Sequence, residues 1–209
     1  NEEFNRVKSR ISNVKSPYDA AKILDAENGI GKIEIPRDDA SQGTVTLNIF
    51  WKADVGGGNS SYEIVRQAIR PRSNDDDSDR RFDVTLLING LPLIQIELKK
   101  STVEINQAFN QIKKYAGENK YTDIYSLLQM FVIMSPDSSA YFANARPDEF
   151  NKSFVFKWRD KDNQPVENGM DFAKSALNIP MAHKLVSEYK AIDEERKKLL
   201  LLRPYQIYA

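Results

Sequence analysis

The chain has 209 residues, with 30 Lys and Arg against 30 Asp and Glu, 41% hydrophobic and 10% aromatic residues, no cysteine and one histidine. This composition excludes an intrinsically disordered chain, a disulfide scaffold, a thiolate nucleophile and any site built from several imidazoles. We expect a globular protein of one domain, or one domain with an appendage, whose catalysis would use carboxylates, lysine or a hard metal.

The cysteine content and the net charge bear on the cellular compartment and on the partners. A chain without cysteine fits a reducing compartment, so a cytoplasmic protein is the simplest expectation. No apolar run approaches the roughly 20 residues that a membrane helix needs. A net charge of zero means that any nucleic acid must be held by local basic patches. Because the first residue is Asn1, we interpret the sequence as a piece of a longer chain.

The N-terminal residues 1–37 are predicted to form one or two short amphipathic helices. Phe4, Val7 and Ile11 recur there at helical spacing. We assign residues 1–43 to an N-terminal helical segment, in which no chemistry is evident.

Strand and loop signals follow this segment. Thr44–Trp51 is predicted to be a strand, and a glycine-rich loop follows at residues 56–58. Residues 60–63 (SSYE) have a capping-box spelling and predict a helix to about Ile69. A glycine loop before a helix can bind phosphate, but the absence of a P-loop Gly-Lys-Ser/Thr ending favours a flexible connector. The four aspartates in residues 74–79 lack EF-hand spacing, which favours a solvated loop over a cation site.

The middle of the chain is the most informative part. Phe82–Ile88 and Leu91–Leu98 are apolar, β-rich runs, and the Asn-Gly at residues 89–90 predicts a hairpin between them. Residues 101–104 (STVE) have a second capping-box spelling. Apolar residues at helical spacing then predict an amphipathic helix that ends near Gly117.

Further strands are predicted after this helix. Leu127–Met134 is continuously apolar, which predicts a strand buried on both faces, and Ala140–Ala143 and Phe154–Trp158 are shorter candidates. The order of these elements predicts an α/β fold with a central mixed β-sheet flanked by helices. We assign residues 44–160 to this core.

The C-terminal part is predicted to be helical again from about Met170. We assign residues 161–209 to a helical segment, with His183 near its start in a surface or half-buried position. The apolar stripe consists of Met181, Leu185, Tyr189, Ile192 and Leu199.

Asp83 and Glu97 are ionisable carboxylates inside apolar β-runs, where an unpaired charge costs several kcal/mol. Lys99 lies on the same side of its strand as Glu97, because side chains alternate with period two. The pattern Glu-x-Lys occurs four times, but only Glu97 follows a predicted strand and hairpin with a partner acid upstream. Asp83, Glu97 and Lys99 are therefore a candidate site of two acids and one cation.

The hairpin register decides whether this site exists. A strict two-residue loop would pair Asp83 with Ile96 and place Asp83 and Glu97 on opposite faces. A three-residue loop would bring Asp83 directly opposite Glu97. We therefore predict an odd loop or a bulge in one strand.

Two carboxylates on one face suit a hard divalent cation such as Mg²⁺, which prefers oxygen ligands and keeps several waters. The cation would offset the buried charge of Asp83 and Glu97 and would activate water for phosphodiester hydrolysis, with Lys99 stabilising negative charge. A buried ion network without catalysis explains the same residue types and stays open at this point.

The helix after the hairpin adds candidates to this site. Gln111 and Tyr115 lie one turn apart beside its apolar stripe, where they can reach over the edge of the sheet. Nearby lysines are candidates for contact with a phosphate backbone. These are Lys100, Lys113, Lys114 and Lys120.

Two stretches of these residues match a known family. Phe82–Lys100 (FDVTLLINGLPLIQIELKK) and Gln107–Tyr115 (QAFNQIKKY) closely resemble the nuclease domain of the restriction (R) subunit of type I restriction-modification enzymes. The clearest match covers about residues 82–144. Residues 203–206 (RPYQ) resemble the short element that precedes the helicase motor of these subunits.

The resemblance implies roles for individual residues. Asp83, Glu97 and Lys99 correspond to the PD-(D/E)xK catalytic triad, with Asp83 and Glu97 as metal ligands. Gln111 and Tyr115 correspond to the Gln-x-x-x-Tyr motif of RecB-like nucleases. Two further residues bear on the comparison. These are Phe82, which stands where the motif name has proline, and Glu63, an additional candidate acidic ligand on the predicted helix.

The resemblance also implies partners and a reaction. The family uses Mg²⁺ to cleave double-stranded DNA, and it assembles with modification (M) and specificity (S) subunits. ATP would be used only by helicase motor domains outside this sequence, which has no Walker A motif. A noncatalytic DNA-binding or motor-docking domain of the same fold is the alternative. A RecB-like repair nuclease is disfavoured by the amino-acid sequence of residues 89–93 (NGLPL).

Overall fold

The computed structural model describes residues 2–25, 29–72 and 77–209. The strands are β1 (Ile30–Pro36), β2 (Thr44–Trp51), β3 (Tyr62–Arg70), β4 (Arg80–Ile88), β5 (Leu91–Leu98), β6 (Met130–Met134), β7 (Ser139–Ala143), β8 (Lys190–Asp193) and β9 (Lys198–Leu201). The α-helices are α1 (Glu2–Ser12), α2 (Pro17–Leu24), α3 (Ile105–Gly117), α4 (Gly169–Ala176), α5 (Met181–Ser187) and α6 (Pro204–Ile207).

The central sheet is mixed and has five strands in the order β3-β4-β5-β6-β7. Neighbouring strands are antiparallel except β5 and β6, which are parallel. A parallel pair needs a crossover connection, and the segment that carries α3 provides it. The predicted α/β fold with a mixed sheet flanked by helices is confirmed.

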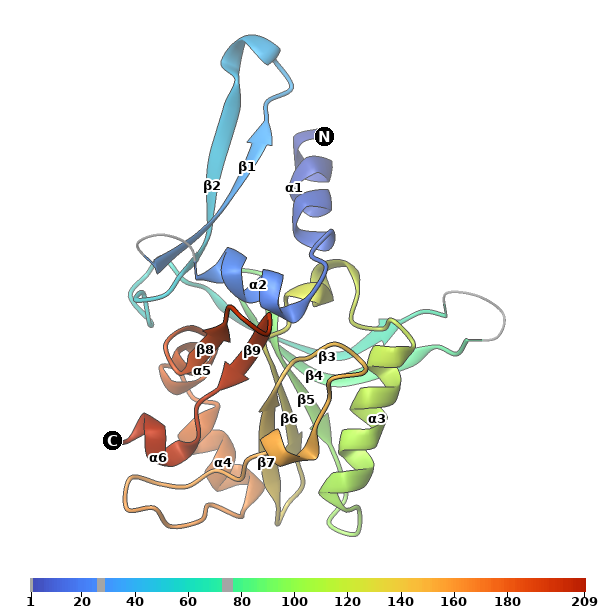
Figure 1. Cartoon of the computed structure of the whole chain (residues 1–209), viewed down its shortest axis with the longest axis vertical. Helices are drawn as coiled ribbons and strands as arrows, with labels where there is room; N and C mark the ends of the chain where they lie inside the picture. The colour runs from blue at the N-terminus through green and yellow to red at the C-terminus, as the bar shows by residue number, and fades with distance from the viewer. Residues whose placement is uncertain (1, 26–28, 73–76) are drawn as a thin grey trace.

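Helix α3 covers one face of this sheet (Figure 1). Its buried residues Phe109 and Ile112 pack in one hydrophobic cluster with Phe131 of β6 and Phe142 of β7. The positions of Phe109 and Ile112 follow the predicted helical stripe, so the face of α3 that was expected to be apolar is the face that is buried.

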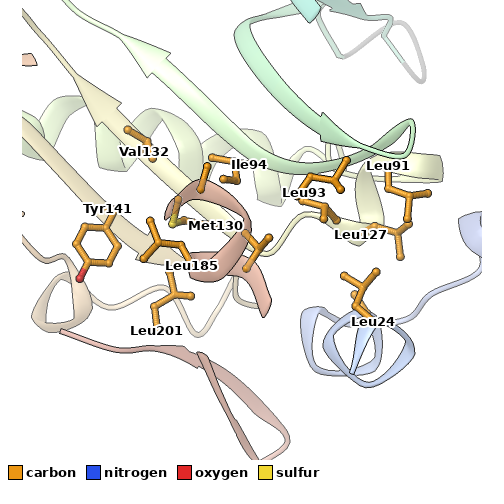
Figure 2. Close-up of a cluster of buried hydrophobic side chains, with 14 of the residues drawn as sticks. Leu24, Leu91, Leu93, Ile94, Leu127, Met130, Val132, Tyr141, Leu185 and Leu201 are labelled. Carbon is orange, nitrogen blue, oxygen red and sulfur yellow. The ribbon is translucent and has the colours of Figure 1, made fainter. Parts of the chain in front are cut away.

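The opposite face of the sheet contacts both ends of the chain. Figure 2 shows Ile94 and Met130 of the sheet together with Leu24 of α2, Leu185 of α5 and Leu201 of β9. The N-terminal and C-terminal segments thus complete the same hydrophobic core as the central sheet. No helix in the described part of the chain is both long and apolar enough to cross a membrane.

The N-terminal segment contains the two predicted helices and one strand that was not predicted. Ser16 caps α2 by accepting a hydrogen bond from the N–H of Asp19 at 3.1 Å. Strand β1 pairs antiparallel with β2, and this hairpin extends away from the body of the molecule beside α1 (Figure 1). Gly31 lies against the backbone of α2, where an added Cβ would lie 3.0 Å from the carbonyl oxygen of Ile23.

The helix predicted for residues 60–69 is wrong, because this segment forms the edge strand β3. It pairs antiparallel with β4, so Ile64 and Val65 lie in a ladder rather than on a helix. β-branched residues favour this extended state, and pairing with β4 outweighs the local capping-box signal. The glycine-rich loop therefore precedes a strand, and the helix N-terminus that a phosphate site requires is absent there.

The C-terminal segment is not a single long helix as predicted. It contains α4, α5, the β8–β9 hairpin and the short α6. Leu199 and Leu201 are buried while Lys198 and Leu200 are half-buried, which is the period-two pattern of a strand. The apolar stripe was therefore assigned the wrong period beyond α5.

His183 was predicted to be exposed or half-buried, and it is fully buried instead. Its ring stacks on Phe50 with centroids 5.1 Å apart. Nδ1 lies 2.9 Å from the hydroxyl of Tyr62, and Nε2 lies 2.9 Å from the carbonyl oxygen of Trp51. The histidine thus joins α5 to β2 and β3 through its two nitrogens.

Smaller differences concern element ends. Phe154–Trp158 does not form a strand, although Phe156 makes an isolated bridge with Tyr141. Helix α3 begins after Glu104, which makes no side-chain capping bond, so the capping box predicted at residues 101–104 does not form. The strand predicted from Leu127 begins at Met130.

Candidate active site

The hairpin between β4 and β5 has a two-residue turn followed by a bulge. Asn89 and Gly90 have φ angles of 54° and 74°, which Asn and Gly tolerate and which a tight hairpin turn requires. The register then shifts between Leu86 and Leu87, because β5 contains one extra residue there, Leu93, which has no partner on β4.

This bulge sets the face on which each acid lies. Beyond it Val84 pairs with Ile96, so the next position along each strand brings Asp83 level with Glu97. Without the shift, Asp83 would be level with Ile96. The predicted bulge is confirmed, and it places Asp83 on the same side of the sheet as Glu97.

The Asp83 carboxylate is held by backbone as well as by side chain. Its Oδ2 accepts a hydrogen bond from the N–H of Leu98 at 2.8 Å, which ties the start of β4 to the end of β5. Its Oδ1 lies 3.5 Å from Nε2 of Gln67 on β3. The orientation of the carboxyl group is therefore set by the two neighbouring strands.

Glu97 is 3% exposed and makes charged and neutral hydrogen bonds. Its Oε1 accepts from Lys99 Nζ at 2.6 Å and from Gln111 Nε2 at 2.6 Å. Burial raises the pKa of Glu97 above its usual 4.5, the bond from Lys99 opposes that rise, and the nearby charge of Asp83 adds to it. The buried carboxyl group of Glu97 thus lies near the half-buried carboxylate of Asp83.

Gln111 links the triad to the helix that covers it. Its Oε1 accepts from Lys99 Nζ at 2.8 Å, and its Nε2 also donates to the hydroxyl of Tyr115 at 2.9 Å. Glu97, Lys99, Gln111 and Tyr115 therefore form one continuous hydrogen-bond network. Such a network fixes side chains that would otherwise rotate.

The Tyr115 ring is itself fixed by β4. It stacks on Phe82 with centroids 6.4 Å apart, and the guanidinium carbon of Arg80 lies 5.2 Å from its centroid. Arg80 also makes a bidentate pair with Glu118, both hydrogen bonds being 2.7 Å long. Phe82 is 1% exposed, so the residue at the proline position of the motif anchors β4 under α3.

The donor set fits a hard divalent cation with few protein ligands. Within the described residues, no three His, Asp or Glu side chains cluster closely enough to hold a metal. Asp83 and Glu97 supply two carboxylates, and Mg²⁺ is commonly bound by one or two carboxylates with the remaining positions filled by water and phosphate. A cation there would offset the repulsion that contributes to the raised pKa of Glu97.

The predicted phosphate-contacting lysines divide into two groups. Lys100 and Lys113 are exposed, and Lys114 is exposed with a long contact of 3.8 Å to Glu118. Lys120 is buried, donates to the carbonyl oxygen of Pro71 at 3.0 Å and pairs with Asp77. Lys120 is therefore part of the structure and is not available to DNA.

The aspartates of the acidic loop are only partly described. Asp77 is the ion-pair partner of Lys120, and Asp79 accepts the N–H of Arg72 at 2.8 Å. Asp75 and Asp76 lie outside the described residues.

Glu63 does not join the triad. It lies on β3 opposite Leu87, which is four residues along β4 from Asp83 and hence about 13 Å away at the rise of a strand. Its side chain is exposed. Glu63 is therefore too far from Asp83 to serve as the additional acidic ligand.

Comparison with known proteins identifies the family. Residues 5–150 match the family model described as type I restriction enzyme R protein N terminus. This chain belongs to that family. The Staphylococcus aureus strain COL endonuclease subunit of type I restriction enzyme SauCOLORF180P is 35% identical over 207 residues, which are 99% of this chain and 21% of the relative.

Two further relatives extend the family comparison. The Staphylococcus saprophyticus type I restriction enzyme SsaAORF53P endonuclease subunit is 35% identical over 99% of this chain and 20% of its own length. The Escherichia coli type I restriction enzyme EcoprrI endonuclease subunit is 39% identical over 62% of this chain and 42% of its own length. The chain thus spans about a fifth of the staphylococcal relatives that it matches.

Sequence reasoning missed two contributors to the site of this R protein domain. Gln67 was placed on a predicted helix, so nothing pointed to its position beside Asp83. The Arg80–Glu118 pair joins residues 38 positions apart, and only the packing of α3 on β4 brings them together. The β-branched residues Ile64, Val65 and Ile69 were the available signal for a strand at Gln67.

Proposed function

We propose that this chain is the nuclease domain of a type I restriction enzyme R subunit and that it hydrolyses phosphodiester bonds of double-stranded DNA with Mg²⁺. The observation that carries the proposal is the bulged register of β4 and β5, which brings Asp83 level with Glu97 beside Lys99. A domain that served only as a scaffold would gain no stability from two carboxylates placed together in a largely apolar sheet.

Each residue of the site has a distinct task in this proposal. Asp83 and Glu97 would hold Mg²⁺, which when bound supplies Lewis-acid polarisation of the phosphodiester and a more acidic water. Lys99 is held by Glu97 and Gln111 at the site, where its ammonium group stabilises the negative charge that develops on the phosphate. Tyr115 holds Gln111 in place from the side of α3.

The surrounding surface supports a DNA substrate without base recognition. Lys100, Lys113 and Lys114 are exposed close to the triad in sequence or on α3, and lysines bind phosphate without reading bases. Sequence recognition would then belong to the S subunit and methylation to the M subunit. ATP-driven translocation would belong to helicase motor domains of the same parent chain.

The test is cleavage of supercoiled plasmid DNA, with Mg²⁺ binding measured by calorimetry, for the chain alone and for the complex with M and S subunits. We expect Asp83→Ala and Glu97→Ala each to lower cleavage by about 10³-fold or more and to remove Mg²⁺ binding. Glu63→Ala is the matched control, because it removes an exposed carboxylate from the same sheet and should leave both measurements unchanged.

The contrary results are distinct from one another. Cleavage that persists in both acid variants would show that these carboxylates are structural. DNA binding by the assembled enzyme without cleavage, under conditions where related R subunits cut, would favour a noncatalytic docking domain instead.

A further inference from the structure

Gln67 has an unusual backbone conformation for a residue in the middle of a strand. Its φ angle is 56°, a left-handed value that only Gly, and less readily Asn and Asp, adopts without strain. The other non-glycine residues with positive φ in the described part of the chain lie in turns or loops or at the first residue of a helical turn. They are Asn89, Asn119, Asp123, Asn163 and Lys197.

The irregularity lies directly across from a candidate metal ligand. The β3–β4 ladder pairs Arg66 with Val84 and Ala68 with Phe82, and it omits Gln67 and Asp83 between them. One residue on each strand is therefore out of regular pairing. Strain of this kind persists in folded proteins where the surroundings enforce it, and such positions cluster at functional sites.

The side chain of Gln67 is directed to the Asp83 carboxylate. Its Nε2 lies 3.5 Å from Asp83 Oδ1, while Asp83 Oδ2 is held by the N–H of Leu98 at 2.8 Å. Gln67 is exposed, so burial of its side chain does not compensate for the backbone conformation. The contact with Asp83 is the interaction that the unusual conformation provides.

We propose that Gln67 is a positioning residue, which holds the Asp83 carboxylate from the side of β3 in an orientation that lets Asp83 and Glu97 bind one Mg²⁺ ion. The inference rests on the proposed function of the triad. The amide of Gln67 and the backbone of β5 hold opposite oxygens of the same carboxyl group, which limits its rotation. Side chains that orient a metal ligand in this way commonly change metal affinity 10–100-fold when removed.

Gln67→Gly is the decisive variant, because glycine accepts the positive φ and removes only the amide side chain. We expect the Gly variant to unfold at the same temperature as the parent chain or higher, because the backbone strain is relieved. We also expect its Mg²⁺ affinity, measured by calorimetry, to fall about 10–100-fold. Plasmid cleavage should fall with it and recover partly at high Mg²⁺ concentration.

Asn163→Gly is the matched control, since Asn163 is an exposed residue with a φ angle of 59° in a loop outside the triad. It should relieve strain in the same way and leave Mg²⁺ affinity unchanged. A purely structural role for Gln67 would change the unfolding temperature alone, and equal Mg²⁺ affinity in Gln67→Gly and the parent would overturn the proposal.

Failure of the inference is separable from failure of the proposed function. If the parent binds Mg²⁺ and loses it in Asp83→Ala, but Gln67→Gly binds as the parent does, only the role of Gln67 is wrong. If the parent in the complex with M and S subunits neither binds Mg²⁺ nor cleaves DNA, the proposed function and the role of Gln67 both fail.

Discussion

Glu97 and His183 are both buried ionisable side chains, but their surroundings differ in kind. His183 lies between the hydroxyl of Tyr62 and the carbonyl oxygen of Trp51, so both of its hydrogen-bond partners are neutral. Burial lowers the pKa of His183 below its usual 6.5 and favours the neutral ring. Glu97 has the cation of Lys99 on one side and the charge of Asp83 near it.

The difference separates a structural position from a chemical one. Both nitrogens of His183 are within hydrogen-bond distance of neutral partners. The ring therefore joins three elements and has no nitrogen left to bind an ion. At Glu97, burial and the nearby charge of Asp83 disfavour the charged form of the carboxyl group, and only the contacts from Lys99 and Gln111 oppose them. A position that is electrostatically unfavourable in this way is a better candidate for binding a cation than a position that is already satisfied.

Among variants that change the surroundings of Glu97, Lys99→Met should have the largest effect on cleavage. The substitution leaves Glu97 without its cation and removes the ammonium group that we assign to charge stabilisation, so plasmid cleavage should fall by about 10³-fold. Lys113→Met, which removes an exposed lysine from α3, is the control and should change cleavage little. Comparable cleavage by the Lys99 and Lys113 variants would contradict the role of Lys99.

His183→Leu should affect stability and leave the chemistry unchanged. The hydroxyl of Tyr62 and the carbonyl oxygen of Trp51 would lose a buried partner, which costs about 3 kcal/mol in the free energy of unfolding. Urea unfolding measures this loss, and plasmid cleavage below the transition should stay within about twofold. A large loss of cleavage in a folded His183→Leu chain would show that the two positions are not independent.

Tyr115→Phe should produce a smaller effect on cleavage than the loss of Lys99. The ring contacts with Phe82 and Arg80 remain, but the acceptor for Gln111 is lost, so cleavage should fall about tenfold. Tyr125→Phe is a suitable control, since Tyr125 also packs on Phe82 and no hydroxyl contact with the triad involves it in the described structure. Equal rates for the two variants would remove Tyr115 from the network.

Acid should reveal the smallest effect, again at His183. Because its pKa is lowered in the folded state, the unfolded chain takes up a proton first as the pH falls below 6.5. The stability that the neutral ring contributes is therefore complete above pH 6.5 and declines below it. Comparing the urea midpoints of the parent and His183→Leu at pH 7.5 and 5.5 isolates the contribution of His183 to stability. We expect the difference between the two chains to be smaller at pH 5.5.

Local sequence patterns predicted the centre of the fold well. Apolar, β-rich runs, the Asn-Gly turn and the helical stripe identified β4, β5 and α3. Counting residues around the turn led to the predicted bulge, which the structure contains. These predictions held because each depends on neighbours within a few residues. The triad and the Gln111–Tyr115 pair were found in the same way, from residue types on elements whose period was clear.

Predictions failed where long-range pairing opposed the local signal. Residues 60–63 spell a capping box, but β4 pairs with that segment and makes it a strand. The stripe from Met181 to Leu199 suits a helix, yet Leu199 and Leu201 bury against the core as β9. The buried place of His183 depends on Phe50 and Tyr62, which are more than 100 residues away.

The sequence by itself determined the class of fold, the chemistry available to a chain without cysteine and with one histidine, and the identity of the triad residues and of Gln111 and Tyr115. Only the tertiary structure decided how those residues are held. The orientation of the Asp83 carboxylate depends on contacts from β3 and β5. The position of the Tyr115 ring depends on Arg80, which Glu118 holds in place. The physical reason is that residue types and local periods are properties of short segments, whereas orientation and burial arise from contacts between segments far apart in the chain.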